Sequence, residues 1–229
     1  MLKASGSVEA ASVKIGMIFD GVGLSPNQWT VVSLIPAIIG FVALLYSQLL
    51  LGAVLFLLSG LIDAIDGAVA RVTGAVSNLG AFLDGVIDRY VEILLYFGLL
   101  FYMMSYCGFT IFVPHYYWVA LLIFGAIMPT FVRSYADHRG VVTEPEDHKR
   151  MGGLIERAER LGFIFAGMIL GVFNPLFLVF MVMMTAILSN VTAIQRITFV
   201  VKFAKHGSTG SDFKAAERKV VQAKPRRRG

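Results

Sequence analysis

Residues 63–88 read DAIDGAVARVTGAVSNLGAFLDGVID and carry four aspartates where two long apolar runs face each other across a short turn. These runs, at 49–70 and 80–104, are each long enough to cross a membrane, because about 20 apolar residues span the hydrocarbon core. Charged side chains in such helices are costly unless something compensates for them, and they often mark function. The stretch therefore predicts two membrane helices and a functional site where they meet.

The composition places the whole chain in the membrane class. Only 15% of its 229 residues are charged and 57% are hydrophobic, whereas a soluble domain carries about 25% charged residues. We expect an all-α, polytopic membrane protein with about six transmembrane helices. The predicted spans are 28–48, 49–70, 80–104, 113–136, 160–173 and 175–203. The fifth is short, so we expect it to include part of the preceding segment.

The ends of the chain differ from this membrane domain at 28–203. Within the N-terminal juxtamembrane segment 1–27, apolar residues alternate at spacings of three and four: Val8, Ala11, Ile15, Ile18 and Val22. This stripe predicts an amphipathic helix on the membrane surface, or a face for a partner helix. The basic segment 204–229 is predicted to be a disordered, solvated tail. Attraction to anionic lipid heads can accompany it, and we expect no nucleic-acid binding.

The charges also predict an orientation. The turns at 47–48, 105–115 and 173–174 contain no Lys, Arg, Asp or Glu, so the charged residues gather at the opposite side. An excess of basic residues marks the cytoplasmic side of a membrane. We therefore expect a multi-pass protein of the cytoplasmic membrane, with both termini and the active site facing the cytoplasm.

The four aspartates have the spacing of a metal site. Asp63 and Asp66 are three residues apart and Asp84 and Asp88 four apart, so each pair lies on one helical face. Converging carboxylates repel one another, and divalent cations such as Mg²⁺, Mn²⁺ or Ca²⁺ offset that repulsion. Two ions would suit chemistry at phosphate. The alternative, solvated residues at helix ends, explains Asp84 at a helix start but not the first pair at a helix C-terminus.

Small and basic residues accompany the aspartates. Gly67 follows Asp66 directly, and Gly80 precedes Asp84 by four residues; glycine lets a ligand or backbone approach closely. Arg71 lies one turn beyond Gly67 and can hold a phosphate with its planar guanidinium.

The pattern D-x2-D-G-x2-A-R-x8-G-x3-D-x3-D, from Asp63 to Asp88, resembles the signature of the CDP-alcohol phosphotransferases at every fixed position. The resemblance implies a six-span homodimeric enzyme of phospholipid biosynthesis. In that reaction an alcohol hydroxyl attacks the lipid-side phosphorus of a CDP-linked lipid, and CMP leaves. CDP-diacylglycerol and CDP-archaeol would present the same head group to the site.

The resemblance also assigns roles by position. Asp63, Asp66, Asp84 and Asp88 would bind two Mg²⁺ or Mn²⁺ ions, and Asp88 would also be the general base. The residues implied for CDP-lipid binding are Gly67, Ala70, Arg71 and Gly80. Asn27 and Thr30 are further nucleotide-side candidates, although a helix cap or turn explains them equally well.

Later stretches bear on the acceptor alcohol. Arg196 lies deep in the last predicted span, and an intramembrane arginine is by default a functional candidate. RSYADHR at 133–139, GGLIERAERL at 152–161 and QR at 195–196 resemble the phosphatidylinositol-phosphate synthase branch, which includes archaetidylinositol-phosphate synthases. The resemblance implies inositol phosphate as acceptor. The residues implied for its phosphate are Ser134, Arg157 and Arg196, with Arg133 and Arg139 as further cations.

Two alternatives remain open from the sequence. Asp137 stands where the branch has a lysine, so either another cation takes that role or the enzyme is a sibling that uses glycerol phosphate, serine or another inositol-containing acceptor. A divalent-cation transporter would also place carboxylates inside helices. The transporter alternative predicts polar residues toward the outer face. The outer halves of the second and third spans, LLLGAVLFLLSG and LLYFGLLFYMM, contain almost none.

Overall fold

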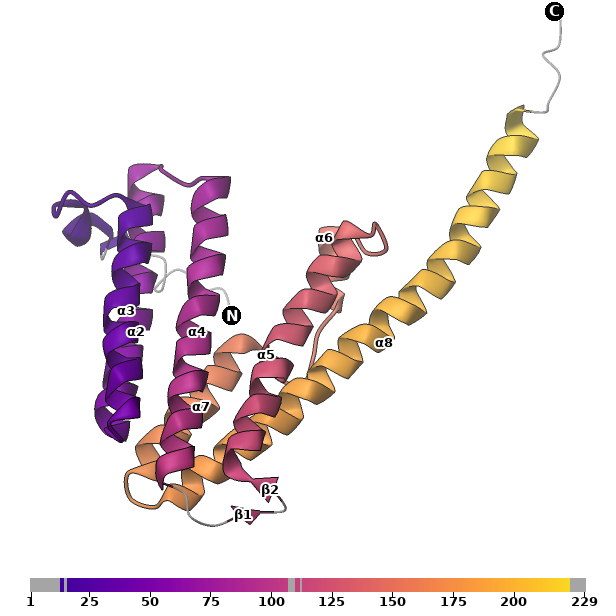
Figure 1. The fold of residues 1–229 in the computed structure, drawn as a ribbon. Coiled ribbons are helices and arrows are strands. Elements are labelled where there is room, and N and C mark those ends of the chain that lie inside the picture. Colours follow the sequence, from indigo (N-terminus) through magenta and orange to yellow (C-terminus); the bar gives the residue numbers. More distant parts are fainter. Residues whose placement is uncertain (1–12, 15, 107–109, 112, 223–229) are drawn as a thin grey trace, which may run out of the picture.

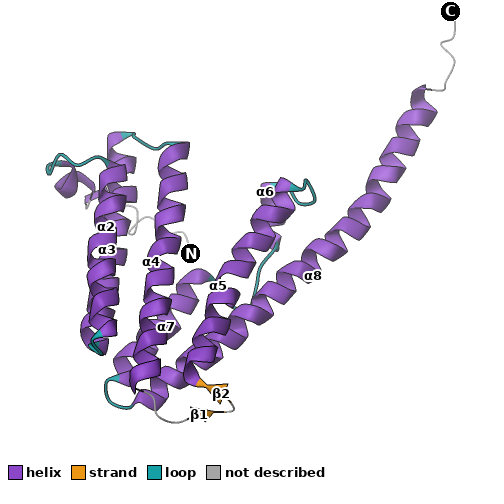
Figure 2. Ribbon diagram, in the orientation of Figure 1, coloured by secondary structure: helices purple, strands orange, loops and turns teal. Residues whose placement is uncertain are grey.

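The protein is built almost entirely from helices (Figure 2). A computed structural model describes residues 13–14, 16–106, 110–111 and 113–222. The long helices are α2 (Pro26–Leu45), α3 (Leu49–Thr73), α4 (Asn78–Tyr106), α5 (His115–His138), α7 (Arg157–Gly171) and α8 (Pro175–Gln222). A short helix, α6 (Pro145–Arg150), and a small antiparallel hairpin of β1 (Thr110–Ile111) and β2 (Val113–Pro114) complete the described elements. The all-α prediction is confirmed.

Four described helices are long and apolar enough to cross a membrane: α2, α3, α5 and the Pro175–Lys205 part of α8. The other two predicted spans coincide with α4 and α7. In α4 the first half carries the charged residues Asp84, Asp88, Arg89 and Glu92. Helix α7 has 15 residues, which makes it about 22 Å long. The chain is thus a helical membrane protein in which α4 and α7 carry charged residues at the ends that include Asp88 and Arg157.

The long helices form two groups that meet at one end (Figure 1). Helices α2, α3 and α4 lie together, α5 lies along α8, and α7 packs on α8 and α3. The groups are close near the β1–β2 hairpin and diverge toward the α3–α4 turn. The shared core includes Leu44, Leu95, Leu99, Leu122 and Met168, each at most 1% exposed.

Local sequence explains the helix ends next to the site. Pro26 occupies the first turn of α2, where a missing N–H costs nothing. The preceding Ser25 N–H donates to Gln28 Oε1 at 2.8 Å. Helix α3 ends at Gly74 with a left-handed backbone, φ +68°, which glycine adopts without strain. This stop turns the chain into α4 and brings the two aspartate pairs to the same end of the helices.

The ends of the chain agree only partly with the sequence predictions. Residues 13–14 and 16–20 are helical, and Gly16 approaches α3 so closely that an added Cβ would lie 2.5 Å from the Ala68 carbonyl oxygen. Val8, Ala11 and Ile15 lie outside the described residues, so the surface helix stays a prediction. The predicted tail differs, because α8 continues as a helix to Gln222. Its last stretch, FKAAERKVVQ, is rich in strong helix formers.

Close packing of α5 on α8 yields a test of this fold. A Cβ at Gly125 would lie 2.6 Å from Asn190 Nδ2 and 3.1 Å from the Asn190 backbone nitrogen. Asn190 cannot easily move away, because its Nδ2 donates to the Leu121 and Ala186 carbonyls at 2.9 and 2.8 Å. We expect Gly125→Ala to cost about 1–3 kcal/mol and to lower Tm in a detergent thermal melt. Gly162→Ala is the control, since nothing lies within 4 Å of its added Cβ; equal melts for both variants would contradict this packing.

Candidate active site

Three aspartates converge between α3 and α4. Asp63, Asp66 and Asp84 each offer a carboxylate oxygen, and these oxygens lie within 4.8 Å of one another. Asp66 is the most buried of the three, at 8% exposure, and accepts a short hydrogen bond from Thr30 Oγ1 on α2. The site thus draws on three helices, with Thr30 fixing the orientation of Asp66.

Beside these aspartates is a cavity of about 230 Å³ at the α3–α4 turn. All six residues predicted for CDP-lipid binding line it together with Asp66 and Asp84: Asn27, Thr30, Gly67, Ala70, Arg71 and Gly80. A Cβ at Gly80 would lie 3.2 Å from both Asn27 Oδ1 and Ser77 Oγ, so glycine permits the close approach of α2 and α4. At Gly67 the nearest atom to an added Cβ is Arg71 Nη1 at 3.6 Å. The absence of a side chain there keeps the cavity open.

Asp88 has a different environment. Its carboxylate forms a short ion pair with Arg157 Nη1, and its carbonyl oxygen accepts from Arg157 Nη2 at 3.3 Å. Both residues line a second cavity of about 80 Å³, which Asp63 also borders. The fourth aspartate therefore lies between the carboxylate cluster and a cation that α7 supplies.

A buried ionic network adjoins this pair and was not predicted from the sequence. Glu92 on α4 is 4% exposed and contacts Arg160, which is 3% exposed, through Arg160 Nη2 at 2.5 Å and Nε at 3.0 Å. Tyr96 Oη donates to the same Glu92 oxygen at 2.8 Å. The available signal was spacing, since Asp84, Asp88, Glu92 and Tyr96 recur every four residues along α4. Glu92 thus continues the aspartate face into the bundle.

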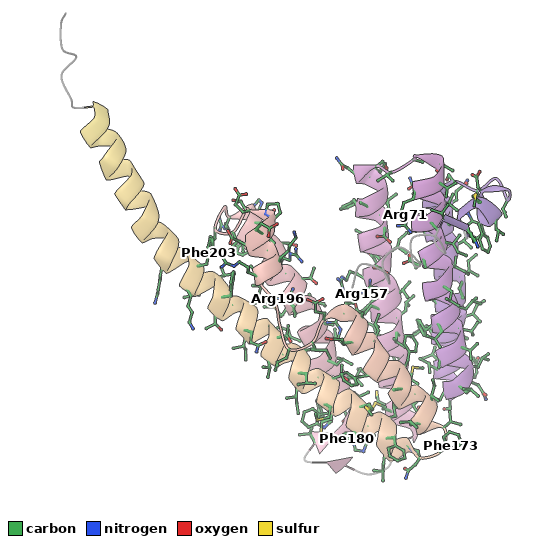
Figure 3. All side chains as sticks on the ribbon, turned by 180° about the vertical axis from the view of Figure 1, so that it is seen from behind. Arg71, Arg157, Phe173, Phe180, Arg196 and Phe203 are labelled. Carbon is green, nitrogen blue, oxygen red and sulfur yellow. The ribbon has the colours of Figure 1, made fainter. Side chains whose placement is uncertain are left out.

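The structure does not gather the predicted acceptor residues into one cavity. Arg157 borders the 80 Å³ cavity, whereas Ser134 borders another of about 400 Å³ between α4 and α5, and Glu92 lines both. Arg196 on α8 donates through Nη1 to the Pro129 carbonyl of α5 at 3.0 Å. Figure 3 shows Arg157 at the start of α7, between α8 and the α3–α4 pair, with Arg196 on α8. A phosphate reached by all of them would have to lie between these helices.

The remaining predicted cations lie at the end of α5. Arg133 and Arg139 are exposed. Arg139 is turned toward Tyr135: its Nε donates to the Tyr135 hydroxyl at 3.0 Å and its guanidinium carbon lies 5.2 Å from the ring centroid. Asp137, the residue that departs from the expected lysine, lies with Oδ1 3.3 Å from His148 Nε2 of α6. Its carboxylate therefore holds α6 against the end of α5.

Comparisons with known proteins agree with this geometry. The family model described as CDP-alcohol phosphatidyltransferase matches residues 24–204, which include the aspartates, the surrounding cavities and Arg157. The chain belongs to this family, so it is an enzyme of the CDP-alcohol phosphotransferase class.

Within the family, the similarities point to one branch. The chain is 33% identical to an archaetidylinositol phosphate synthase of Pyrococcus horikoshii, over 80% of this chain and 87% of the relative. It is 32% identical to a phosphatidylinositol phosphate synthase of Mycobacteroides abscessus, over 76% of each chain. The structure of the Mycobacterium tuberculosis phosphatidylinositol phosphate synthase with CDP-DAG bound matches with a TM-score of 0.72 and 25% identity, covering 82% of this chain and 92% of that one.

The carboxylate cluster fits the divalent ions that the family implies. Hard oxygen donors suit Mg²⁺ and Mn²⁺, and three such donors from two helices lie close enough to share an ion. A crystal structure of the M. tuberculosis enzyme contains manganese and citrate; it matches this chain with a TM-score of 0.71 and 25% identity, over 82% of this chain and 88% of that one.

The hydrogen bond from Thr30 to Asp66 tests whether this cluster binds metal. Outer residues that orient a ligand contribute about 10- to 100-fold to metal affinity. We expect Thr30→Val to weaken Mn²⁺ binding by about tenfold in a calorimetric titration of the purified protein. Thr73→Val is the matched control, because Thr73 donates to the Val69 carbonyl of its own helix at 2.9 Å. If both variants bound Mn²⁺ equally well, Thr30 would not orient a ligand.

Proposed function

We propose that the protein transfers the lipid phosphate of a CDP-linked lipid to a hydroxyl of inositol phosphate and releases CMP. The observation that supports this proposal is that three parts of such a reaction adjoin one another: a cavity for the nucleotide, a carboxylate cluster for metal ions, and a base beside an arginine. A cavity lined by small residues and Arg71 adjoins the aspartate cluster, and the cluster adjoins the Asp88–Arg157 pair.

Each part has a role that follows from its chemistry. Gly67, Ala70 and Gly80 leave room for the nucleotide, and Arg71 faces the same cavity with a cation for the diphosphate. Divalent ions held by the aspartates would supply positive charge to the diphosphate oxygens. Asp88 accepts the proton of the attacking hydroxyl. A new bond forms between that oxygen and the lipid-side phosphorus, and the phosphorus–oxygen bond to CMP breaks.

The acceptor assignment rests on Arg157. Its guanidinium borders the same cavity as Asp63 and Asp88, so a phosphate bound there would hold its own hydroxyl close to the base. Arginine binds phosphate through two parallel N–H groups. Ser134 and Arg196 complete the proposed acceptor site from α5 and α8, with Arg133 and Arg139 at its outer edge. The identity of the relatives supports inositol phosphate over other acceptors.

The proposal extends to the arrangement in the membrane. We propose six spans within 28–203, with α4 and α7 completing the four apolar helices, and a homodimer as the family resemblance implies. The uncharged turns at 47–48 and 173–174 support a site that faces the cytoplasm. The proposed donor lipid is CDP-diacylglycerol or CDP-archaeol, because both would present the same head group to the cavity that Gly67, Ala70 and Arg71 line.

An acceptor panel tests the reaction directly. Purified protein with CDP-diacylglycerol or CDP-archaeol and Mn²⁺ is expected to release CMP when inositol phosphate is added. Inositol, glycerol phosphate and serine are expected to give little release. Asp88→Asn is expected to lower kcat by about 100-fold or more, because the base is lost. Release with glycerol phosphate instead would keep the family chemistry and remove the acceptor assignment.

The position of Asp137 gives a second test. Because its carboxylate contacts His148 and is exposed, we expect Asp137→Asn to change the KM for inositol phosphate by no more than about twofold. An exposed pair of this kind contributes at most about 1 kcal/mol. Arg157→Lys is the comparison variant and is expected to raise that KM, since lysine cannot bind phosphate bidentately. A large KM change in Asp137→Asn would place this residue at the acceptor.

A further inference from the structure

Glu92 is the most buried acidic side chain next to the site. It lies one helical turn beyond Asp88 on the same face of α4 and is 4% exposed. It lines both the cavity that contains Arg157 and the cavity that contains Ser134. A negative charge at this position works against an anionic acceptor unless it serves the arrangement of the cations around it.

One carboxylate oxygen of Glu92 is committed to Arg160. Oε1 accepts from Arg160 Nη2 and Nε and from the Tyr96 hydroxyl. Arg160 Nε also lies 3.1 Å from that hydroxyl. Because the Arg160 side chain is 4% exposed and directed at Glu92, it balances this buried charge and is not presented to a substrate phosphate.

The other carboxylate oxygen faces Arg157. Oε2 accepts from Arg89 Nη1 at 2.6 Å and lies 3.5 Å from Arg157 Nε. With its Nε toward Glu92, Arg157 directs both Nη atoms to Asp88 and the cavity. Glu92 therefore lies at the Nε side of the guanidinium, and the terminal nitrogens lie toward Asp88.

Helix α8 provides a separate set of contacts, which hold the backbone just before Arg157. In the loop before α7, Ile155 N–H donates to Thr192 Oγ1 at 3.1 Å and Leu154 N–H to Gln195 Oε1 at 2.9 Å. These bonds tie the loop before α7 to α8. They do not set the direction of the long Arg157 side chain, which Glu92 and Asp88 contact from α4.

From these contacts we propose that Glu92 is a positioning residue for acceptor binding. Its carboxylate attracts the Nε side of the Arg157 guanidinium, 3.5 Å away, so that the two Nη groups are presented to the acceptor phosphate. Arg160 and Tyr96 keep the Glu92 carboxylate fixed. This inference rests on the proposed function and adds to it a residue that acts through Arg157.

The test separates the two substrates. With full-length protein, Mn²⁺ and CDP-diacylglycerol, Glu92→Gln is expected to raise the KM for inositol phosphate about tenfold, because the negative charge that attracts Arg157 is removed. The KM for CDP-diacylglycerol should change by no more than about twofold. KM does not depend on the concentration of active enzyme, so partial unfolding does not obscure the comparison. Glu146→Gln, an exposed carboxylate on α6, controls for the chemical change.

Two double variants distinguish positioning from stability. Glu92→Gln leaves Arg160 buried without its counter-ion, whereas Glu92→Gln with Arg160→Gln removes both charges and is expected to restore Tm. The KM for inositol phosphate should stay raised in this double variant. On an Arg157→Ala background, Glu92→Gln should raise it further by no more than about twofold, because the residue acts through Arg157.

Several outcomes would overturn the inference. They are an unchanged KM for inositol phosphate in Glu92→Gln, its recovery when Arg160 is also replaced, an equal rise in both KM values, or full additivity with Arg157→Ala. Failure of the proposed function is seen separately, because wild-type protein would then release no CMP with inositol phosphate.

Discussion

The structure depends on keeping several carboxylates together where two membrane helices meet. Asp63 and Asp66 from α3 and Asp84 from α4 share one small volume, and such a cluster is unfavourable without nearby positive charge. The protein brings part of that charge from a distant segment, since Arg157 pairs with Asp88 across 69 positions of sequence. Side chains of α4 must therefore reach both α3 and α7, which also pack directly on each other.

The buried ion pair of Glu92 and Arg160 fixes how α7 is oriented against α4. Replacing a buried ion pair by apolar residues is often neutral for stability, but removing one partner costs about 3–5 kcal/mol. The pair therefore penalises any rotation of α7 that would separate the two charges. Arg157 lies one turn before Arg160 on that helix, so the setting that satisfies Arg160 also directs Arg157 at Asp88. Packing and charge select one arrangement of the site.

Much of this arrangement could be predicted from local pattern. Apolar runs located the long helices to within a few residues, apart from the C-terminal end of α8. The spacing of the aspartates and glycines named residues that line two cavities of the site. Partners far apart in sequence could not be predicted, because spacing on one helix does not say which arginine meets Glu92. The role of Asp137 could not be predicted for the same reason. Its contact, His148, lies on a six-residue helix, and no apolar periodicity indicates this helix in the sequence. The continuation of α8 depends on helix propensity, which the basic character of the tail obscured.

The divergence of the helices toward the α3–α4 turn has a consequence for the lipid. The two groups of helices meet near the hairpin and diverge toward the α3–α4 turn, where the 230 Å³ cavity lies, so in the proposed function a head group enters and departs on that side. In the proposed orientation the donor lipid and the product lipid would then occupy a single leaflet, and the reaction itself would move no charge across the bilayer.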